Sequence, residues 1–103
     1  MLVIDETHDN GVAQVRVGDP IRLQLSESPT TGYRWHMQSA VAPALRMLAD
    51  SFEASGGGSG GGGVRFWTIV AEKPAVVALK VELKRSWEPT PVKAFNVTID
   101  AKA

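Results

Sequence analysis

The chain lacks cysteine and has no surplus of charge of either sign. Its 103 residues contain no Cys and equal numbers of basic and acidic side chains, 11 Lys+Arg against 11 Asp+Glu. Without cysteine, disulfides, thiol nucleophiles and thiolate metal sites are excluded. Without a basic surplus, we expect neither nucleic acid nor an acidic membrane surface as the main partner.

Long apolar runs are also missing. The longest, residues 40–45 and 75–79, have the length of a strand and fall far short of the ~18–20 residues of a membrane-spanning helix. Residues 1–6 show no basic segment followed by an apolar one, so no signal peptide is expected in this chain. The sequence leaves localisation open: periplasmic or secreted if a leader has been trimmed, and cytoplasmic otherwise.

The chain length and its hydrophobic period together indicate the organisation. A chain of this size corresponds to one domain, so we expect a single domain over residues 1–103. Apolar and polar side chains alternate along several segments, which is typical of strands with one buried and one exposed face. These segments are residues 13–17, 21–25, 77–83 and 95–99.

Turn-forming residues separate the alternating runs and predict eight short strands. The strands are expected near residues 2–5, 12–17, 20–26, 32–38, 44–54, 64–72, 76–85 and 92–101. The predicted fold class is all-β, an immunoglobulin-like antiparallel β-sandwich of about seven to eight strands. The Ala, Leu and Met content of residues 40–48 leaves one or two helical turns open as an alternative there.

The sequence contains candidate motifs for catalysis and metal binding, but none of them has the structural context that its chemistry needs. Residues 57–61 match the pattern Gly-x-Ser-x-Gly, but that nucleophile motif needs a preceding strand, a following helix and a large α/β sheet. His8 and His36 would form a metal site only if the fold joined them to a carboxylate. We therefore expect no catalytic residue, no metal site and no cofactor, and we do not expect an enzyme.

Three segments have compositions that are unusual for plain turns. They are Ser-Pro-Thr-Thr-Gly at 28–32, the glycine-rich run at 55–63, and Arg-Ser-Trp-Glu-Pro at 85–89. Glycine lets a backbone approach another surface closely, and Trp and Arg are enriched at binding hot spots. Each segment also has an ordinary interpretation: a hairpin turn, a natural or engineered spacer, and a Trp that caps the core.

Taken in order, these segments resemble the chagasin family of protein inhibitors of papain-like cysteine peptidases. The family pattern is Asn-Pro-Thr-Thr-Gly-aromatic, then Gly-x-Gly-Gly, then Arg-Pro-Trp. Residues 29–33, 60–63 and 85–87 match it, and the resemblance covers almost the whole chain. Ser28 replaces the usual Asn, and Ser86 replaces the usual Pro, which predicts a less rigid third loop.

The resemblance implies that three loops meet at one end of the sandwich and enter the cleft of a papain-like cysteine peptidase as a wedge. The peptidase-binding residues it implies are Pro29, Thr30, Thr31, Gly32, Gly60, Gly61, Gly62, Gly63, Arg85, Ser86 and Trp87. By family analogy the threonine loop lies over the catalytic Cys–His pair and the glycine loop along the non-primed side. Trp87 then packs on the primed side, supported by Arg85. Inhibition is reversible and non-covalent, by a protein that is expected to be a monomer when free.

An adhesion or accessory module with the same immunoglobulin-like fold is the alternative. Its loops would bind another protein or a glycan, and it would not inhibit a peptidase. Trp35, Trp67 and Trp87 could stack on sugars if they shared an exposed face. We instead expect Trp35 and Trp67 to lie in the core, one in each sheet.

Overall fold

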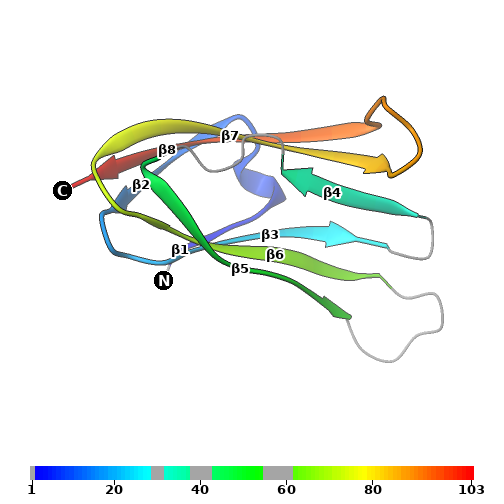
Figure 1. Cartoon of the computed structure of the whole chain (residues 1–103), viewed down its shortest axis with the longest axis horizontal. Helices are drawn as coiled ribbons and strands as arrows, with labels where there is room; N and C mark the ends of the chain where they lie inside the picture. The colour runs from blue at the N-terminus through cyan, green and yellow to red at the C-terminus, as the bar shows by residue number, and fades with distance from the viewer. Residues whose placement is uncertain (1, 29–31, 38–42, 55–61) are drawn as a thin grey trace.

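Two four-stranded sheets pack face to face in an elongated sandwich of 45 × 30 × 22 Å (Figure 1). The computed structural model describes residues 2–28, 32–37, 43–54 and 62–103. The strand order is β1-β3-β6-β5 in one sheet and β2-β8-β7-β4 in the other. The elements in the described residues are β1 (Leu2–Ile4), the 3-10 helix η1 (Glu6–His8), β2 (Gly11–Arg16), β3 (Ile21–Glu27), β4 (Tyr33–Met37), β5 (Leu45–Ala54), β6 (Gly63–Ala71), β7 (Ala75–Arg85) and β8 (Lys93–Lys102).

These bounds confirm the eight predicted strands to within one residue at each end. The helical alternative for residues 40–48 is wrong for its described part, because the chain is already in β5 from Leu45 onward. Residues 38–42 lie outside the described residues. No helix in the described part of the chain is long and apolar enough to cross a membrane.

The core lies between the two sheets and is made by the inward side chains of the alternating strands. Leu25 of β3 and Val81 of β7 are both fully buried, and Phe95 of β8 is 2% exposed. Each such side chain contributes about 1.5–3 kcal/mol when it leaves water. Trp35 on β4 and Trp67 on β6 are buried, one in each sheet, so this prediction is confirmed.

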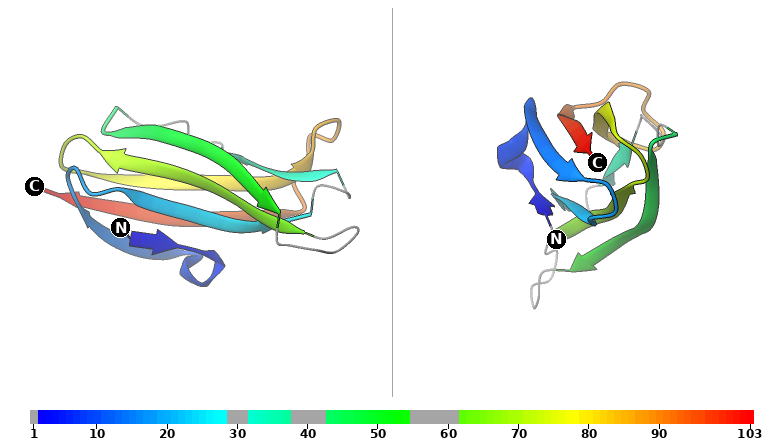
Figure 2. Two further views of the ribbon diagram at one scale, coloured as in Figure 1. Left: turned by 90° about the horizontal axis from the view of Figure 1, so that it is seen from below. Right: turned by 90° about the vertical axis from the view of Figure 1, so that its left-hand side faces the viewer.

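Both sheets are mixed, which corrects the expectation of a purely antiparallel sandwich. The pairs β3–β6, β5–β6, β4–β7 and β7–β8 are antiparallel. At the opposite edges, β1 runs parallel to β3 and β2 runs parallel to β8. Both edge strands come from the N-terminal segment, which runs along one sheet as β1, reverses at η1 and returns along the other sheet as β2 (Figure 2). Because of this reversal β1 and β2 run in opposite directions, and each is parallel to its neighbour.

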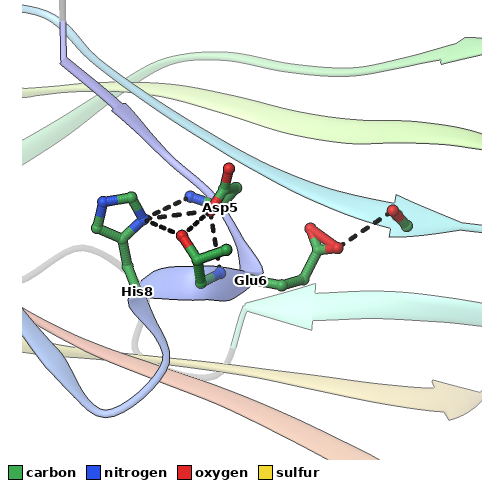
Figure 3. A network of polar contacts seen from close by, with 5 residues as sticks. Asp5, Glu6 and His8 are labelled. Carbon is green, nitrogen blue, oxygen red and sulfur yellow. Dashed lines mark hydrogen bonds and ion pairs between the residues drawn. The ribbon is translucent and has the colours of Figure 1, made fainter.

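A capped 3-10 turn makes this reversal (Figure 3). The backbone N–H and the hydroxyl of Thr7 donate to Oδ1 of Asp5, at 3.0 and 2.6 Å, and the backbone N–H of Asp5 donates to Nδ1 of His8 at 3.1 Å. The hydrogen bonds from Thr7 hold the pKa of Asp5 below its ordinary value of 3.8. The Ser26 hydroxyl donates to Oε2 of Glu6 at 3.2 Å, which ties the turn to β3.

Candidate functional site

The strand ends that flank three connections lie at one end of the sandwich, the right-hand end in Figure 1. Strands β3, β5 and β7 all run toward this end, and β4, β6 and β8 run away from it. The register aligns their ends, since Gly63 pairs with both Glu27 and Ala54, and Tyr33 pairs with Arg85. The first loop is 28–32, the glycine loop is 55–62, and the third loop is 86–92.

The structure describes six of the predicted binding residues and places all of them at this end. They are Gly32, Gly62, Gly63, Arg85, Ser86 and Trp87. Pro29, Thr30, Thr31, Gly60 and Gly61 lie outside the described residues. The first loop is thus represented by its flanks, and these flanks touch both of the other loops.

Trp87 projects from the third loop and leans on the first. Its side chain is 69% exposed, so it does not cap the core. Gly32 has φ of +83°, and a Cβ at this position would lie 3.0 Å from Cη2 of Trp87. Glycine is therefore favoured at position 32 for two reasons: the positive φ of its backbone and the close approach of the indole.

Arg85 also contacts the indole. Its guanidinium carbon lies 4.4 Å from the ring centroid of Tyr33 and 5.7 Å from that of Trp87. Its Nη1 also lies 3.7 Å from Oε1 of Glu88. Cation–π contacts at exposed sites are worth about 0.5–1 kcal/mol each. The start of β4 and the third loop are thereby joined through one cation.

Backbone hydrogen bonds restrain the third loop even though it has Ser86 in place of proline. The Glu88 N–H donates to the Arg85 carbonyl at 3.1 Å, and the Val92 N–H donates to the Leu83 carbonyl at 2.9 Å. These bonds close a turn directly around Ser86 and Trp87. They limit the loss of rigidity that the serine was expected to bring.

The two described glycines at the end of the glycine loop have packing roles that sequence reasoning missed. A Cβ on Gly62 would lie 3.1 Å from the Ser28 hydroxyl, at the start of the first loop. A Cβ on Gly63 would collide with the Glu53 carbonyl oxygen and the Phe52 ring. Gly63 is a buried strand residue, so the space between β5 and β6 requires glycine there.

Glu27 is a further residue at this end that sequence reasoning missed. Its side chain is completely buried, and it continues the inward phase of Leu23 and Leu25 on β3. A carboxylate in phase with core residues was the available signal, because buried charges are rare unless they are paired.

Both oxygens of the Glu27 carboxylate are occupied. Oε2 accepts the backbone N–H of Trp35 at 2.8 Å, and Oε1 accepts from Nη2 of Arg65 at 3.1 Å. Arg65 also donates from Nη1 to Oδ1 of Asp50 at 3.2 Å. Burial lowers the pKa of Arg65, but the hydrogen bonds and charges of Glu27 and then Asp50 outweigh burial and raise it.

The two histidines lie on different elements, His8 in η1 and His36 on β4. Among the described residues, no three His, Asp or Glu side chains gather closely enough to ligate a metal ion.

Solved structures of similar shape cover nearly the whole chain. The crystal structure of the cysteine protease inhibitor EhICP2 from Entamoeba histolytica has a TM-score of 0.85 at 19% identity, over 98% of this chain and 94% of that one. The solution structure of Amebosin has a TM-score of 0.71 at 21% identity, covering 98% and 97%. PbICP-C, solved in complex with falcipain-2, has a TM-score of 0.65 at 13% identity, covering 97% and 89%. At these identities the likeness concerns the fold.

Sequence comparison gives the family. A search among curated proteins finds no significant match. The chagasin family peptidase inhibitor I42 profile, however, matches residues 14–99, which is most of the chain and includes all three loops. The match favours an inhibitor over both an enzyme and an adhesion module. The chain belongs to the chagasin family of peptidase inhibitors.

Proposed function

We propose that the protein is a reversible, non-covalent inhibitor of papain-like cysteine peptidases that fills the active-site cleft with its three loops. One observation carries this proposal: the first loop is in contact with both others, through Gly32 against Trp87 and Gly62 against Ser28. Contacts between these described flanks hold the bases of the three loops together, which allows the loops to enter a groove as one body. Family membership supports the choice of a peptidase as the partner.

Trp87 serves as the apolar anchor on the primed side of the cleft. An indole that is 69% exposed in the free protein has a large area still to bury. Its contacts with Gly32 and Arg85 hold it in place before binding, so little conformational freedom is lost on association. An aromatic anchor of this kind is a typical binding hot spot.

The glycine loop and the first loop occupy the rest of the cleft. The glycine loop runs along the non-primed side and pairs with the peptidase backbone as a substrate strand would. Because residues 60–63 are all glycine, this part of the loop passes near the catalytic thiolate without presenting a well-placed scissile bond. Thr30 and Thr31 lie over the catalytic Cys–His pair, as the family resemblance implies.

The complex of PbICP-C with falcipain-2 supports a peptidase as the partner of this chain as well. An interface of ~1,600 Å² is the standard size for protease–inhibitor complexes. Inhibition by occlusion needs no bond to the catalytic cysteine, and the inhibitor leaves the complex uncleaved.

The test is a titration of papain with the purified protein, followed with a fluorogenic peptide substrate. We expect inhibition that is complete near one equivalent, reversed by dilution, and accompanied by intact inhibitor on a gel. Papain whose catalytic cysteine carries a methylthio block should still bind in calorimetry, because no covalent step is involved. Full papain activity at micromolar inhibitor would reject the proposal.

A further inference from the structure

The buried Glu27 carboxylate lies directly beneath the junction of the first loop and the glycine loop. Glu27 is the last residue of β3, and the first loop begins at Ser28. In the sheet register Glu27 pairs with Gly63, the first residue after the glycine loop. A change in the contacts of this carboxylate would therefore shift residues that adjoin both loops.

Its partners come from every strand that flanks these two loops. Trp35 is on β4, which follows the first loop, and Arg65 is on β6, which follows the glycine loop. Through Arg65 the chain of contacts reaches Asp50 on β5, which precedes the glycine loop. The bond to Trp35 also crosses from one sheet to the other. Glu27 on β3 thus links β4 and β6 directly, and β5 through Arg65.

Because the Glu27 carboxylate is buried, its hydrogen bonds are costly to break. A carboxylate with no exposure to water has to keep its hydrogen-bond partners, because an unpaired buried charge is strongly destabilising. Charge-assisted bonds of this type are shorter and stronger than neutral ones. Trp35 adds a second cross-link, since its indole N–H donates to the Ser26 carbonyl at 2.8 Å.

We propose that Glu27 is a positioning residue for inhibition, which sets the first loop and the glycine loop at a fixed separation through Trp35 and Arg65. This inference rests on the proposed function, because it assumes that these loops bind the peptidase. With Ser28 and Gly62 held at a fixed separation, the bases of the two loops are in place before binding, so the complex loses less entropy on forming. Glu27 itself is buried and does not reach the partner.

The first experiment compares Glu27→Gln with Glu53→Gln in the full chain. Glutamine keeps the shape and one acceptor for Trp35 but removes the charge that holds Arg65. We expect the inhibition constant for papain to rise by about tenfold or more for Glu27→Gln, in line with the loss of a charged hydrogen bond. Glu53 also flanks the glycine loop, but its side chain is 64% exposed and lies 3.7 Å from Arg22. Glu53→Gln should leave inhibition unchanged.

A double variant separates positioning from simple stabilisation. In Glu27→Gln/Arg65→Met, neither buried charge remains, which commonly restores much of the stability lost on breaking a buried pair. If Glu27 positions the loops, the melting temperature recovers toward that of the wild type while inhibition remains weak. Recovery of both stability and inhibition in the double variant would overturn the proposal.

Amide hydrogen exchange provides a readout that does not depend on inhibition. In Glu27→Gln, we expect faster exchange at the amides of Trp35, Ser28 and Gly62, with unchanged exchange in the core strands. Unchanged exchange at all three amides would overturn the proposal even if papain inhibition holds. If the wild-type protein does not inhibit papain, the function fails while exchange still reports whether Glu27 orders the loops.

Discussion

The indole of Trp87 rests on the Cα of Gly32, so closely that a Cβ at position 32 would lie 3.0 Å from Cη2 of the ring. The two residues belong to different loops and lie 55 positions apart in the chain, the difference of 87 and 32. Gly32 also has φ of +83°, a conformation that favours glycine. The orientation of the exposed anchor is thus coupled to the backbone of the first loop.

Gly32→Ala tests this coupling. Alanine costs about 1–2 kcal/mol in this backbone region and also pushes against the indole. We expect the inhibition constant for papain to rise by about tenfold, because Trp87 has to leave its resting place. Gly18→Ala is the matched control: Gly18 has φ of +91° with nothing within 4 Å of its Cβ position. It should lose similar stability in urea denaturation but inhibit normally. Equal inhibition constants for the two variants would contradict the coupling.

Trp87→Ala should weaken inhibition without affecting the fold. The loss of an aromatic hot spot corresponds to about 2–4 kcal/mol, or roughly 30- to 1,000-fold in the inhibition constant. Because the side chain is 69% exposed and loses only its exposed contacts with Gly32 and Arg85, the free energy of unfolding should change by no more than about 1 kcal/mol. Val76→Ala, at a β7 position that is 70% exposed, is the control and should change neither quantity. A large loss of stability in Trp87→Ala would indicate a core role instead.

Gly63→Ala should act chiefly on stability. The new Cβ collides with the Glu53 carbonyl and the Phe52 ring, and such overpacking costs about 1–3 kcal/mol. Gly62→Ala is the comparison, since its Cβ would lie 3.1 Å from the Ser28 hydroxyl and 3.3 Å from the Glu27 carbonyl, so a shift of a few tenths of an ångström accommodates it. Urea denaturation would measure the free energy of unfolding of both variants, provided that its dependence on urea concentration is the same in each. Wild-type stability of Gly63→Ala would show that β5 and β6 separate easily at this point.

The strands were predictable because burial acts locally along each of them. Alternation such as that of Leu23 and Leu25 specifies a strand and its inward face without knowledge of its neighbours. The direction of pairing has no such local signal. Whether β1 runs parallel or antiparallel to β3 depends on how the chain reverses at η1, and this is decided by contacts such as that of Thr7 with Asp5.

The loops were predictable from unusual composition, whereas the contacts that hold them were not. The sequence left open whether Trp87 caps the core or meets a partner, and its 69% exposure in the structure decides for the surface. The link from Glu27 to Arg65 spans 38 residues and depends on the register of β3 with β6, which single-chain patterns do not specify. The packing role of Gly63 was hidden because every residue of a glycine run looks alike.

Acid stability offers a last prediction, through the cap of the N-terminal turn. The hydrogen bonds from Thr7 lower the pKa of Asp5 below 3.8, so the folded protein favours the ionised carboxylate. This contribution to stability is complete above pH 3.8 and disappears as the pH falls through the folded-state pKa. Asp5→Asn keeps a cap acceptor and should remove this part of the pH dependence of unfolding.

Titration of the Asp5 carboxyl by NMR measures the effect directly. Thr7→Val should move the Asp5 pKa upward toward 3.8, because the side-chain hydrogen bond from Thr7 is the largest cause of the shift. His8→Ala should move it less, since the hydrogen bond and charge of His8 are smaller causes. A wild-type Asp5 that titrates at or above 3.8, or a larger shift in His8→Ala than in Thr7→Val, would show that the cap is held differently in solution.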